Sequence, residues 1–290
     1  MKRINRFTVV SAILCIALVL LCACGSGATA KQEATQPANR LEAILSRGYI
    51  EVVMEPYFAP FQFIDPALPN DKNVVGSDVD LAKYIAEKLG VECRVIPLEF
   101  GAVLAGVTEG KYDMAISGLA YTPEREKAMS LSKGYYFSPS NRGHGLVIHK
   151  DNEGLIKGPD DVKDLTVVAQ SGSLQELFVN EQLDGYKEFK RVSSTNDTFL
   201  SVSEKKADVG VSSLGTAELF IEANPDSGLM IVPDFQFYQD ESTLGTRVGM
   251  PPGEDELLSR VNEIIDEVVA SGIYVDWYDE NSEYAKRLGV

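Results

Sequence analysis

The sequence predicts an α/β fold made of two similar units. Short β-type runs alternate with amphipathic helical segments, and this alternation starts again after Lys150. The chain has 290 residues, of which 44% are hydrophobic and 9% aromatic, a composition typical of globular proteins. That length allows one large domain or two of ordinary size. Two α/β units therefore explain the pattern better than one continuous sheet.

In the first unit, the helix expected over residues 79–89 carries apolar side chains at helical spacing. Asp78 and Asp80 stand at its start, where carboxylates complement the helix dipole. Cys93 falls in an expected strand and is interpreted as a small buried hydrophobe. The other expected elements are strands over 50–54 and 114–116 and a helix over 103–109.

The second unit repeats the same alternation and is followed by a helical C-terminus. Strands are expected over 166–169, near 192, over 207–211 and over 229–232, and helices from 174, over 197–204 and over 216–223. The last forty residues predict one long helix whose buried face contains Leu257, Val261, Ile264, Ile265 and Val268.

Charge and motif content exclude several classes of function. With 27 basic and 43 acidic residues the formal net charge is −16, and without a basic block nucleic acid is not an expected partner. Two histidines and four cysteines, three of them near the N-terminus, supply neither a disulfide framework nor a zinc site. The chain lacks HExxH, GxxxxGK[ST] and GxSxG motifs. We therefore expect neither a metal nor a cofactor.

The first 24 residues have the pattern of an export signal. Lys2, Arg3 and Arg6 precede an apolar run over 9–21 that is short for a permanent membrane span. The run ends in LCACG at 21–25, which resembles a bacterial lipobox in which Cys24 becomes the lipidated mature N-terminus. The alternative is an ordinary signal peptide cut near Ala28 or Ala30.

The residues after Cys24 predict a tether. The segment 25–39, GSGATAKQEATQPAN, has no apolar period and is rich in small and polar residues. The expected organisation is thus a signal peptide over 1–23, a lipid-anchored flexible tether over 24–40, and a folded body outside the cytoplasm.

Several motifs in the body occur together in one order. They are GSDVDLAKYIA at 76–86, PYFAPF at 56–61, YDMAISG at 112–118, TPER at 122–125, VAQSGS at 168–173 and GIY at 272–274 ahead of Trp277. Each is weak alone, but together they span nearly all of residues 41–290. In this combination the chain resembles the family 3 extracellular solute-binding proteins, which serve ABC importers of polar amino acids.

The resemblance implies a two-lobed periplasmic-binding-protein-like fold of type II, with two crossover strands and a ligand cleft between the lobes. Lobe 1 would be discontinuous and comprise residues 41–147 and 244–290, and lobe 2 would comprise 148–243. The lobes would close on a ligand that contacts both of them.

Arg125 is the strongest candidate for a ligand-binding residue. Thr122 and Pro123 form an N-cap and N1 pair, so Arg125 falls in the first turn of a helix that follows a strand. A guanidinium there can hold a carboxylate bidentately. A solvated surface arginine is the alternative from the local pattern alone, but the resemblance aligns Arg125 with the family's carboxylate-binding arginine.

The turn at Gln170, Ser173 and Leu174 joins a strand to a helix and is a second candidate anion site, built from backbone N–H groups. An ordinary βα connection with a serine cap is the alternative. If both sites hold, Arg125 and the N–H groups of Ser173 and Leu174 grip one carboxylate from opposite lobes.

The resemblance implies further contacts from lobe 1. Phe58 and Phe100 would flank the ligand side chain, although isolated aromatic residues are more often part of a core. Glu55 aligns with a position that reaches a distal cationic group, and a solvated loop carboxylate is the alternative. Ser117 and Gly118 belong to the 112–118 motif and complete the expected lobe 1 site.

Two positions depart from the family pattern. Ala120 replaces a usual Ser or Thr, and Ser213 replaces a usual Asp, at the two places that normally enclose the α-ammonium of the ligand. Without that carboxylate, a buried cation loses its charged partner. Ser213 is kept as a ligand-binding candidate. The stretch 137–145, with His144, is also longer than usual before the crossover strand.

These observations predict a monomeric substrate-binding lipoprotein of an ABC importer. It would capture an amino acid or related small carboxylate and deliver it to a permease. We expect a planar or aromatic side chain to be preferred over glutamate and a free α-amino group to matter less than usual. Two alternatives remain, namely an enzyme resembling cyclohexadienyl dehydratase, in which Glu55 is a general acid, and an extracellular sensing module.

Overall fold

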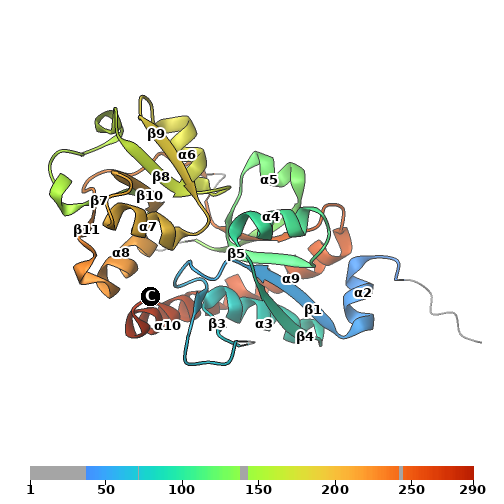
Figure 1. The fold of residues 1–290 in the computed structure, drawn as a ribbon. Coiled ribbons are helices and arrows are strands. Elements are labelled where there is room, and N and C mark those ends of the chain that lie inside the picture. Colours follow the sequence, from blue (N-terminus) through green and yellow to red (C-terminus); the bar gives the residue numbers. More distant parts are fainter. Residues whose placement is uncertain (1–36, 71, 138–142, 242–243) are drawn as a thin grey trace, which may run out of the picture. The chain divides into compact units, whose positions relative to one another are not determined.

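The computed structural model describes residues 37–70, 72–137, 143–241 and 244–290 (Figure 1). Pro37–Val290 form one compact unit. The predicted signal peptide, Cys24 and most of the predicted tether lie outside the described residues. Helix α2 (Arg40–Arg47) already begins within the expected tether, because the Asn39 side chain caps it by accepting a hydrogen bond from Glu42 N–H at 2.9 Å. The helix therefore includes residue 40, which the prediction assigned to the tether.

The first of two five-stranded sheets has the strand order β4-β1-β5-β12-β6. Its centre is parallel, since Val52 of β1 pairs with Val95 of β4 and with Met114 of β5. Strand β12 returns from the far end of the chain and runs antiparallel between β5 and β6. The strands are β1 (Tyr49–Met54), β4 (Glu92–Pro97), β5 (Met114–Ala120), β6 (Ser130–Tyr136) and β12 (Thr246–Met250).

Alternating side chains on these strands bury both faces of the first sheet. Val52 and Ile116 pack on one side with α2, α3 (Ser77–Leu89), α9 (Asp255–Ser271) and α10 (Ile273–Leu288). Val53 and Leu119 pack on the other side with α4 (Phe100–Thr108). A small hairpin of β2 (Phe63–Ile64) and β3 (Val74–Val75) precedes α3.

The second sheet has the order β11-β7-β10-β8-β9. Its strands are β7 (His144–His149), β8 (Thr166–Gln170), β9 (Glu188–Val192), β10 (Val209–Ser213) and β11 (Leu229–Ile231). Helix α6 (Leu174–Gln182) packs on one face, and helices α7 (Thr195–Ser203) and α8 (Leu214–Ala223) pack on the other (Figure 1). This arrangement confirms the alternation of strands and helices predicted after Lys150.

The chain passes between the sheets twice, from β6 to β7 and from β11 to β12. Strand β7 pairs along its whole length with β10, from His144 opposite Ser213 to Ile148 opposite Val209. The predicted lobe boundary at residue 147 therefore falls inside a strand of the second sheet. Sequence periodicity could not place this boundary, because only strand pairing assigns β7 to a sheet.

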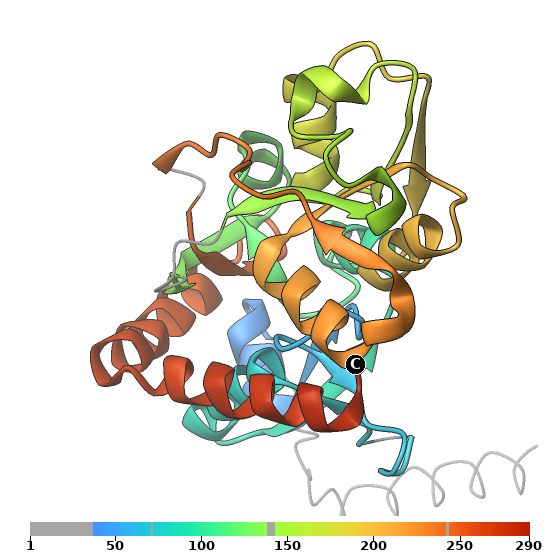
Figure 2. The same cartoon turned by 90° about the vertical axis from the view of Figure 1, so that its left-hand side faces the viewer.

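The C-terminus differs from the prediction of one long helix. Gly272 adopts a left-handed conformation (φ 73°) that ends α9 and starts α10. The five apolar residues predicted on the buried face of α9 are fully buried. Helix α10 reaches α8, where Lys286 Nζ lies 3.2 Å from Glu222 Oε2 (Figures 1 and 2). None of the helices in the described part of the chain has the length and apolar character needed to span a bilayer.

Cys93 is partly buried in β4, and burial raises the pKa of its thiol to about 11. A thiol with this pKa stays protonated at neutral pH, which agrees with the prediction that Cys93 packs as a small hydrophobe.

Asp113 joins α2 to the start of β5. Its fully buried carboxylate forms ion pairs with Arg40 and Arg47 and accepts a hydrogen bond from Glu51 N–H at 2.8 Å. We expect Asp113→Ala to lower the free energy of unfolding by about 1–3 kcal/mol, because Glu51 N–H and the partly exposed Arg40 and Arg47 side chains lose a buried acceptor. Urea denaturation measures this effect. Asp266→Ala is the control, since it removes the exposed pair with Lys133 and should cost less than about 1 kcal/mol; equal losses would contradict the assignment.

Candidate functional site

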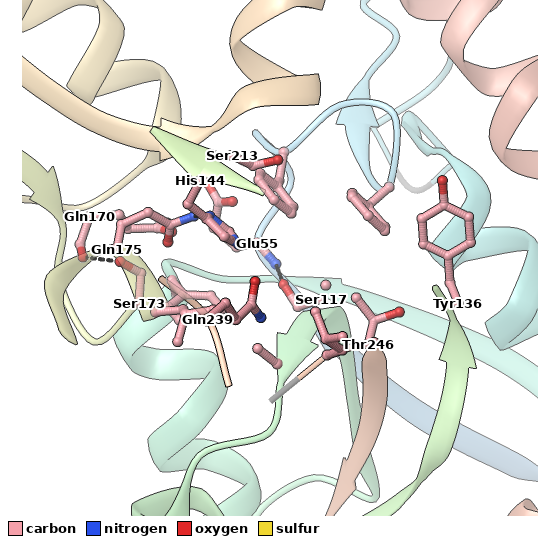
Figure 3. A pocket seen from close by; sticks show the side chains of 18 of the residues that line it. Glu55, Ser117, Tyr136, His144, Gln170, Ser173, Gln175, Ser213, Gln239 and Thr246 are labelled. Carbon is pink, nitrogen blue, oxygen red and sulfur yellow. Dashed lines mark hydrogen bonds between the residues drawn. The ribbon is translucent and has the colours of Figure 1, made fainter. Parts of the chain in front are cut away.

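One cavity is lined by residues from both sheets, and it brings together all ten residues predicted to contact ligand. Figure 3 labels five of them, Glu55, Ser117, Gln170, Ser173 and Ser213. Its volume of about 200 Å³ suits a small solute better than a peptide. The first sheet and its connections contribute Glu55, Phe58, Phe100, Ser117, Gly118 and Arg125, and the second contributes Gln170, Ser173, Leu174 and Ser213. This convergence does not test what each residue binds, so their ligand contacts stay a prediction.

Arg125 is held by the local structure that the sequence predicts. Thr122 caps α5 (Pro123–Ala128) and accepts a hydrogen bond from Arg125 N–H at 3.1 Å. The guanidinium donates to Ala120 O at 2.8 Å and to Gly172 O at 3.0 Å, so it links the two sheets. The side chain is 7% exposed, which rules out the alternative of a solvated surface arginine.

Arg125 is a buried cation with no acidic partner among the described residues. Burial lowers the pKa of its guanidinium to about 10, and the group remains charged at neutral pH. Within the described ranges its acceptors are two backbone carbonyls, and no carboxylate forms an ion pair with it. Buried charges in proteins are normally paired. This guanidinium is therefore well placed to bind an anion that enters the cavity.

The turn after β8 offers one of its two predicted backbone N–H donors to a ligand. Ser173 caps α6 by accepting from Glu176 N–H at 3.1 Å, and its hydroxyl donates to Gln170 O at 2.7 Å. Ser173 N–H lies 3.4 Å from Gln170 O, whereas Leu174 N–H has no acceptor among the described residues. Leu174 N–H is therefore the better of the two predicted donors for a carboxylate.

Glu55 is buried, contrary to the alternative of a solvated loop carboxylate. It follows β1, is 2% exposed, and its Oε1 has no hydrogen-bond partner in the described part of the structure. Burial raises the pKa of the carboxyl to about 8, although Tyr57 N–H and the Gln170 side chain oppose this shift. In the absence of a ligand Glu55 is thus mostly protonated at neutral pH.

The sequence did not identify Gln62, which lies beside Glu55 in the cavity wall. Ser117 Oγ accepts hydrogen bonds from Glu55 N–H at 3.0 Å and from Gln62 Nε2 at 3.3 Å. Gln62 Oε1 is a second buried acceptor that lacks a partner among the described residues. Two such acceptors around one serine favour a ligand group that carries several N–H donors. No sequence signal marked Gln62, because its burial depends on the packing around β2.

Phe58 and Phe100 both line the cavity, and each packs against a different group. Phe58 stacks on Phe61, with ring centroids 5.0 Å apart, and lies over Gly118. Gly118 has φ +56°, and a Cβ there would come within 2.7 Å of the Phe58 ring. Phe100 lies under Arg125, whose guanidinium carbon is 5.5 Å from the ring centroid. The predicted flanking of a ligand side chain by both rings stays a prediction.

Asp78 has a larger role than the predicted complement to a helix dipole. It is fully buried and accepts hydrogen bonds from Gly118 N–H at 2.7 Å, Tyr135 Oη at 2.8 Å and Tyr274 Oη at 2.5 Å. Burial outweighs these bonds and raises the pKa of Asp78 to about 6. The Asp78 carboxylate, which does not itself line the cavity, therefore holds in place the backbone of Gly118, which does.

The two positions that depart from the family pattern, Ala120 and Ser213, both line the cavity. So does His144, which the sequence singled out without assigning it a role, and which pairs with Gln175 at 3.0 Å. Nowhere in the described ranges do three or more His, Cys, Asp or Glu side chains gather as a possible metal site.

Comparison with known proteins identifies the family. The model of the bacterial extracellular solute-binding proteins, family 3, matches residues 50–281. The chain belongs to this family. Its two sheets, with two chain crossings and a cavity lined by both, are the two-lobed type II fold of these solute-binding proteins.

Three relatives illustrate what this solute-binding protein is similar to. The arginine-binding extracellular protein ArtP of Bacillus subtilis is 28% identical over 217 residues, which cover 74% of this chain and 78% of ArtP. The amino-acid ABC transporter substrate-binding protein AbpA of Streptococcus pneumoniae, solved with L-arginine, is 30% identical with a TM-score of 0.75, covering 84% of this chain and 98% of AbpA. An ancestral amino-acid-binding protein, a precursor of cyclohexadienyl dehydratase, is 26% identical with a TM-score of 0.70, covering 84% and 99%.

We expect Glu55→Gln to change how the stability of the ligand-free protein depends on pH. The raised pKa means that the folded protein keeps a proton which the unfolded chain loses above pH 4.5. The contribution of protonated Glu55 to the free energy of unfolding is complete below pH 4.5 and is lost as the pH rises towards 8. The free energy of unfolding of Glu55→Gln relative to wild type should thus rise between these values, by up to about 1.4 kcal/mol per pH unit.

Urea denaturation at pH 5, 6.5 and 8 gives the three points that this prediction needs. Glu283→Gln removes an exposed carboxylate and is the matched control. Parallel pH profiles for Glu55→Gln and wild type would show that Glu55 does not titrate in this unusual range.

Proposed function

We propose that this solute-binding protein is the extracytoplasmic receptor of an ABC importer and captures an amino acid or a related small carboxylate by closure of its two lobes. The observation that carries this proposal is the buried Arg125 guanidinium, which lines the cavity, links both lobes through Ala120 O and Gly172 O, and has no carboxylate partner among the described residues. A ligand carboxylate would supply the missing charge. Because the site takes groups from both lobes, ligand favours the closed arrangement.

The second end of the ligand would meet Glu55 and Gln62. Their unpartnered oxygens suit a planar group with several N–H donors, such as a guanidinium, and a cation there would return Glu55 to its charged form. Relatives named for arginine support such a ligand. The nearby rings of Phe58 and Phe100 favour a planar side chain, so glutamate should be a poor ligand.

We expect Arg125→Ala to weaken binding by about 100-fold or more, because it removes one partner of a buried charge pair. Arg125→Lys should recover only part of the loss, since an ammonium lacks the bidentate fork. A thermal-shift panel of amino acids selects the probe, because ligand at 100 times its Kd adds about 2.7 kcal/mol. Calorimetry then measures the Kd.

Arg260→Ala is the charge-matched control, because this exposed side chain on α9 pairs with Glu263 outside the cavity. Affinity in Arg125→Ala equal to that of the control would refute a carboxylate site at Arg125.

An enzyme is the second candidate function, favoured by the protonated Glu55 in the cavity and by the likeness to a dehydratase precursor. A proton donor in catalysis would act on a ligand that is consumed. Mass spectrometry of the bound ligand after overnight incubation separates the two functions, since a receptor returns it unchanged and an enzyme returns a product.

We expect Cys24→Ala to release the protein from membranes without loss of ligand binding. Release is expected because LCACG at 21–25 resembles a lipobox. Binding should persist because all residues predicted to bind ligand lie in the folded body. Detergent partitioning of the variant and wild type, with calorimetry of the released protein, measures both effects. Membrane retention of the variant would point to another anchor.

A further inference from the structure

The two ionisable groups of the cavity are attached to different points of β5. Among the lining residues that the structure describes, Arg125 is the one permanent cation and Glu55 the one carboxyl. The Glu55 backbone binds β5 at Ser117, and the Arg125 guanidinium binds the same strand at Ala120. Ser117 and Ala120 are three residues apart, and Gly118 between them has φ +56°, so the span is shorter than the about 10 Å of fully extended chain.

Part of the cavity wall that comes from the second sheet and α6 has neutral side chains, and α6 starts two residues after Gly172, whose carbonyl accepts from Arg125. Ser213 of β10 lies directly opposite His144 of β7, and Gln175 of α6 contacts His144. These three residues and Ala120 line the cavity, and Figure 3 shows His144, Gln175 and Ser213 together. Burial lowers the pKa of His144 to about 4, so its ring is uncharged at neutral pH.

Packing holds the His144 ring in place, and the hydrogen bond between His144 and Gln175 can run in either direction. The His144 ring packs on Phe178, with centroids 5.2 Å apart, and its Nδ1 lies 3.0 Å from Gln175 Nε2. In this arrangement the amide donates to Nδ1, so the ring proton is on Nε2, which is left as a donor. Rotation of the amide by 180° would reverse the roles and make Nε2 an acceptor. The pair can therefore bind an uncharged donor or acceptor, but it supplies no negative charge.

An α-amino acid presents an ammonium beside its carboxylate. With the carboxylate on Arg125, that ammonium would enter the neutral wall, lose its hydration and be repelled by the guanidinium. A carboxylic acid whose positive group lies at the far end avoids this cost and still meets Glu55. Separate positions for the Arg125 and Glu55 groups along β5 suit such a ligand.

We propose that His144 and Gln175 are specificity-determining residues that form a neutral subsite, and that the cavity takes a carboxylate with a remote cation, an ω-guanidino or ω-amino carboxylic acid, without requiring an α-amine. The inference rests on the proposed function, because it assumes that Arg125 holds the ligand carboxylate.

Three probes that differ by one group test the ligand class by calorimetry. They are L-arginine, 5-guanidinopentanoic acid, which lacks only the α-amine, and agmatine, which lacks only the carboxylate. We expect the first two to bind within about tenfold of each other and agmatine to bind at least about 100-fold more weakly. A loss of 100-fold or more for the deaminated acid, or no binding of any probe, would overturn the inference.

The same probes separate this inference from the proposed function. If L-arginine binds, Arg125→Ala abolishes its binding and the deaminated acid fails, the inference is wrong and the proposed function stands. If agmatine binds as tightly as L-arginine, Arg125 is not a carboxylate site and both are wrong.

Variants test the two residues themselves. His144→Phe keeps the packing on Phe178 and removes both ring nitrogens, and Gln175→Leu removes their partner; each should weaken binding of the deaminated acid by about five- to tenfold. His149→Phe is the matched control, since His149 lies at the other end of β7 and outside the cavity lining. Unchanged affinity in both cavity variants, with thermal unfolding that shows a native fold, would overturn the assignment.

Ser213→Asp restores a carboxylate opposite His144 and gives an independent readout. It should shift the preference towards L-arginine over the deaminated acid by at least about tenfold, because the α-ammonium gains a charged partner. An unchanged preference would show that the ligand's α-position does not face this wall, and it would overturn the inference even if both probes bind.

Discussion

The buried carboxylate of Asp78 joins the parts of the chain that build the ligand-facing side of the first sheet. It starts α3 and accepts hydrogen bonds from Gly118 in β5, Tyr135 in β6 and Tyr274 in α10. Its environment is costly for a charge, as its raised pKa shows, and the three donors offset that cost. Because Gly118 forms the cavity floor under Phe58, the position of the floor depends on this interaction.

The cavity combines two ionisable groups that are both poorly paired in the absence of ligand. Among the described residues, Arg125 keeps its charge without a carboxylate partner, and burial raises the pKa of Glu55 to about 8, so that its carboxyl is mostly protonated at neutral pH. A ligand with complementary ends would pair both groups at once, and under the proposed function this would favour closure of the lobes. The same groups explain why an enzyme is the relevant rival, since a protonated carboxyl in a dry cavity is also what general acid catalysis uses. What distinguishes the functions is the fate of the ligand, not the shape of the site.

Neutral residues give this site its particular character. Where a second acid would complete a cage for an ammonium, the chain has Ser213, and its strand partner is an uncharged histidine. A binding site discriminates by what it leaves unpaired as well as by what it pairs. The wall formed by His144, Gln175 and Ser213 is therefore as informative about the ligand as the charged ends are.

The sequence by itself determined the α/β alternation, the capped helix that carries Arg125 and the ten residues that converge on the cavity, because periodicity, caps and family motifs are local patterns. Tertiary structure decided the rest. Strand pairing placed all of β7 in the second sheet, and Gly272 divided the last helical region. Packing of distant segments brought Glu55 and Gln62 together at Ser117 and placed Asp78 against the Gly118 backbone. Their environment comes from residues far away in the chain, and no local pattern encodes it. His144 shows the same limit, since only β10 and α6 supply the neighbours that make its ring a neutral part of the cavity wall.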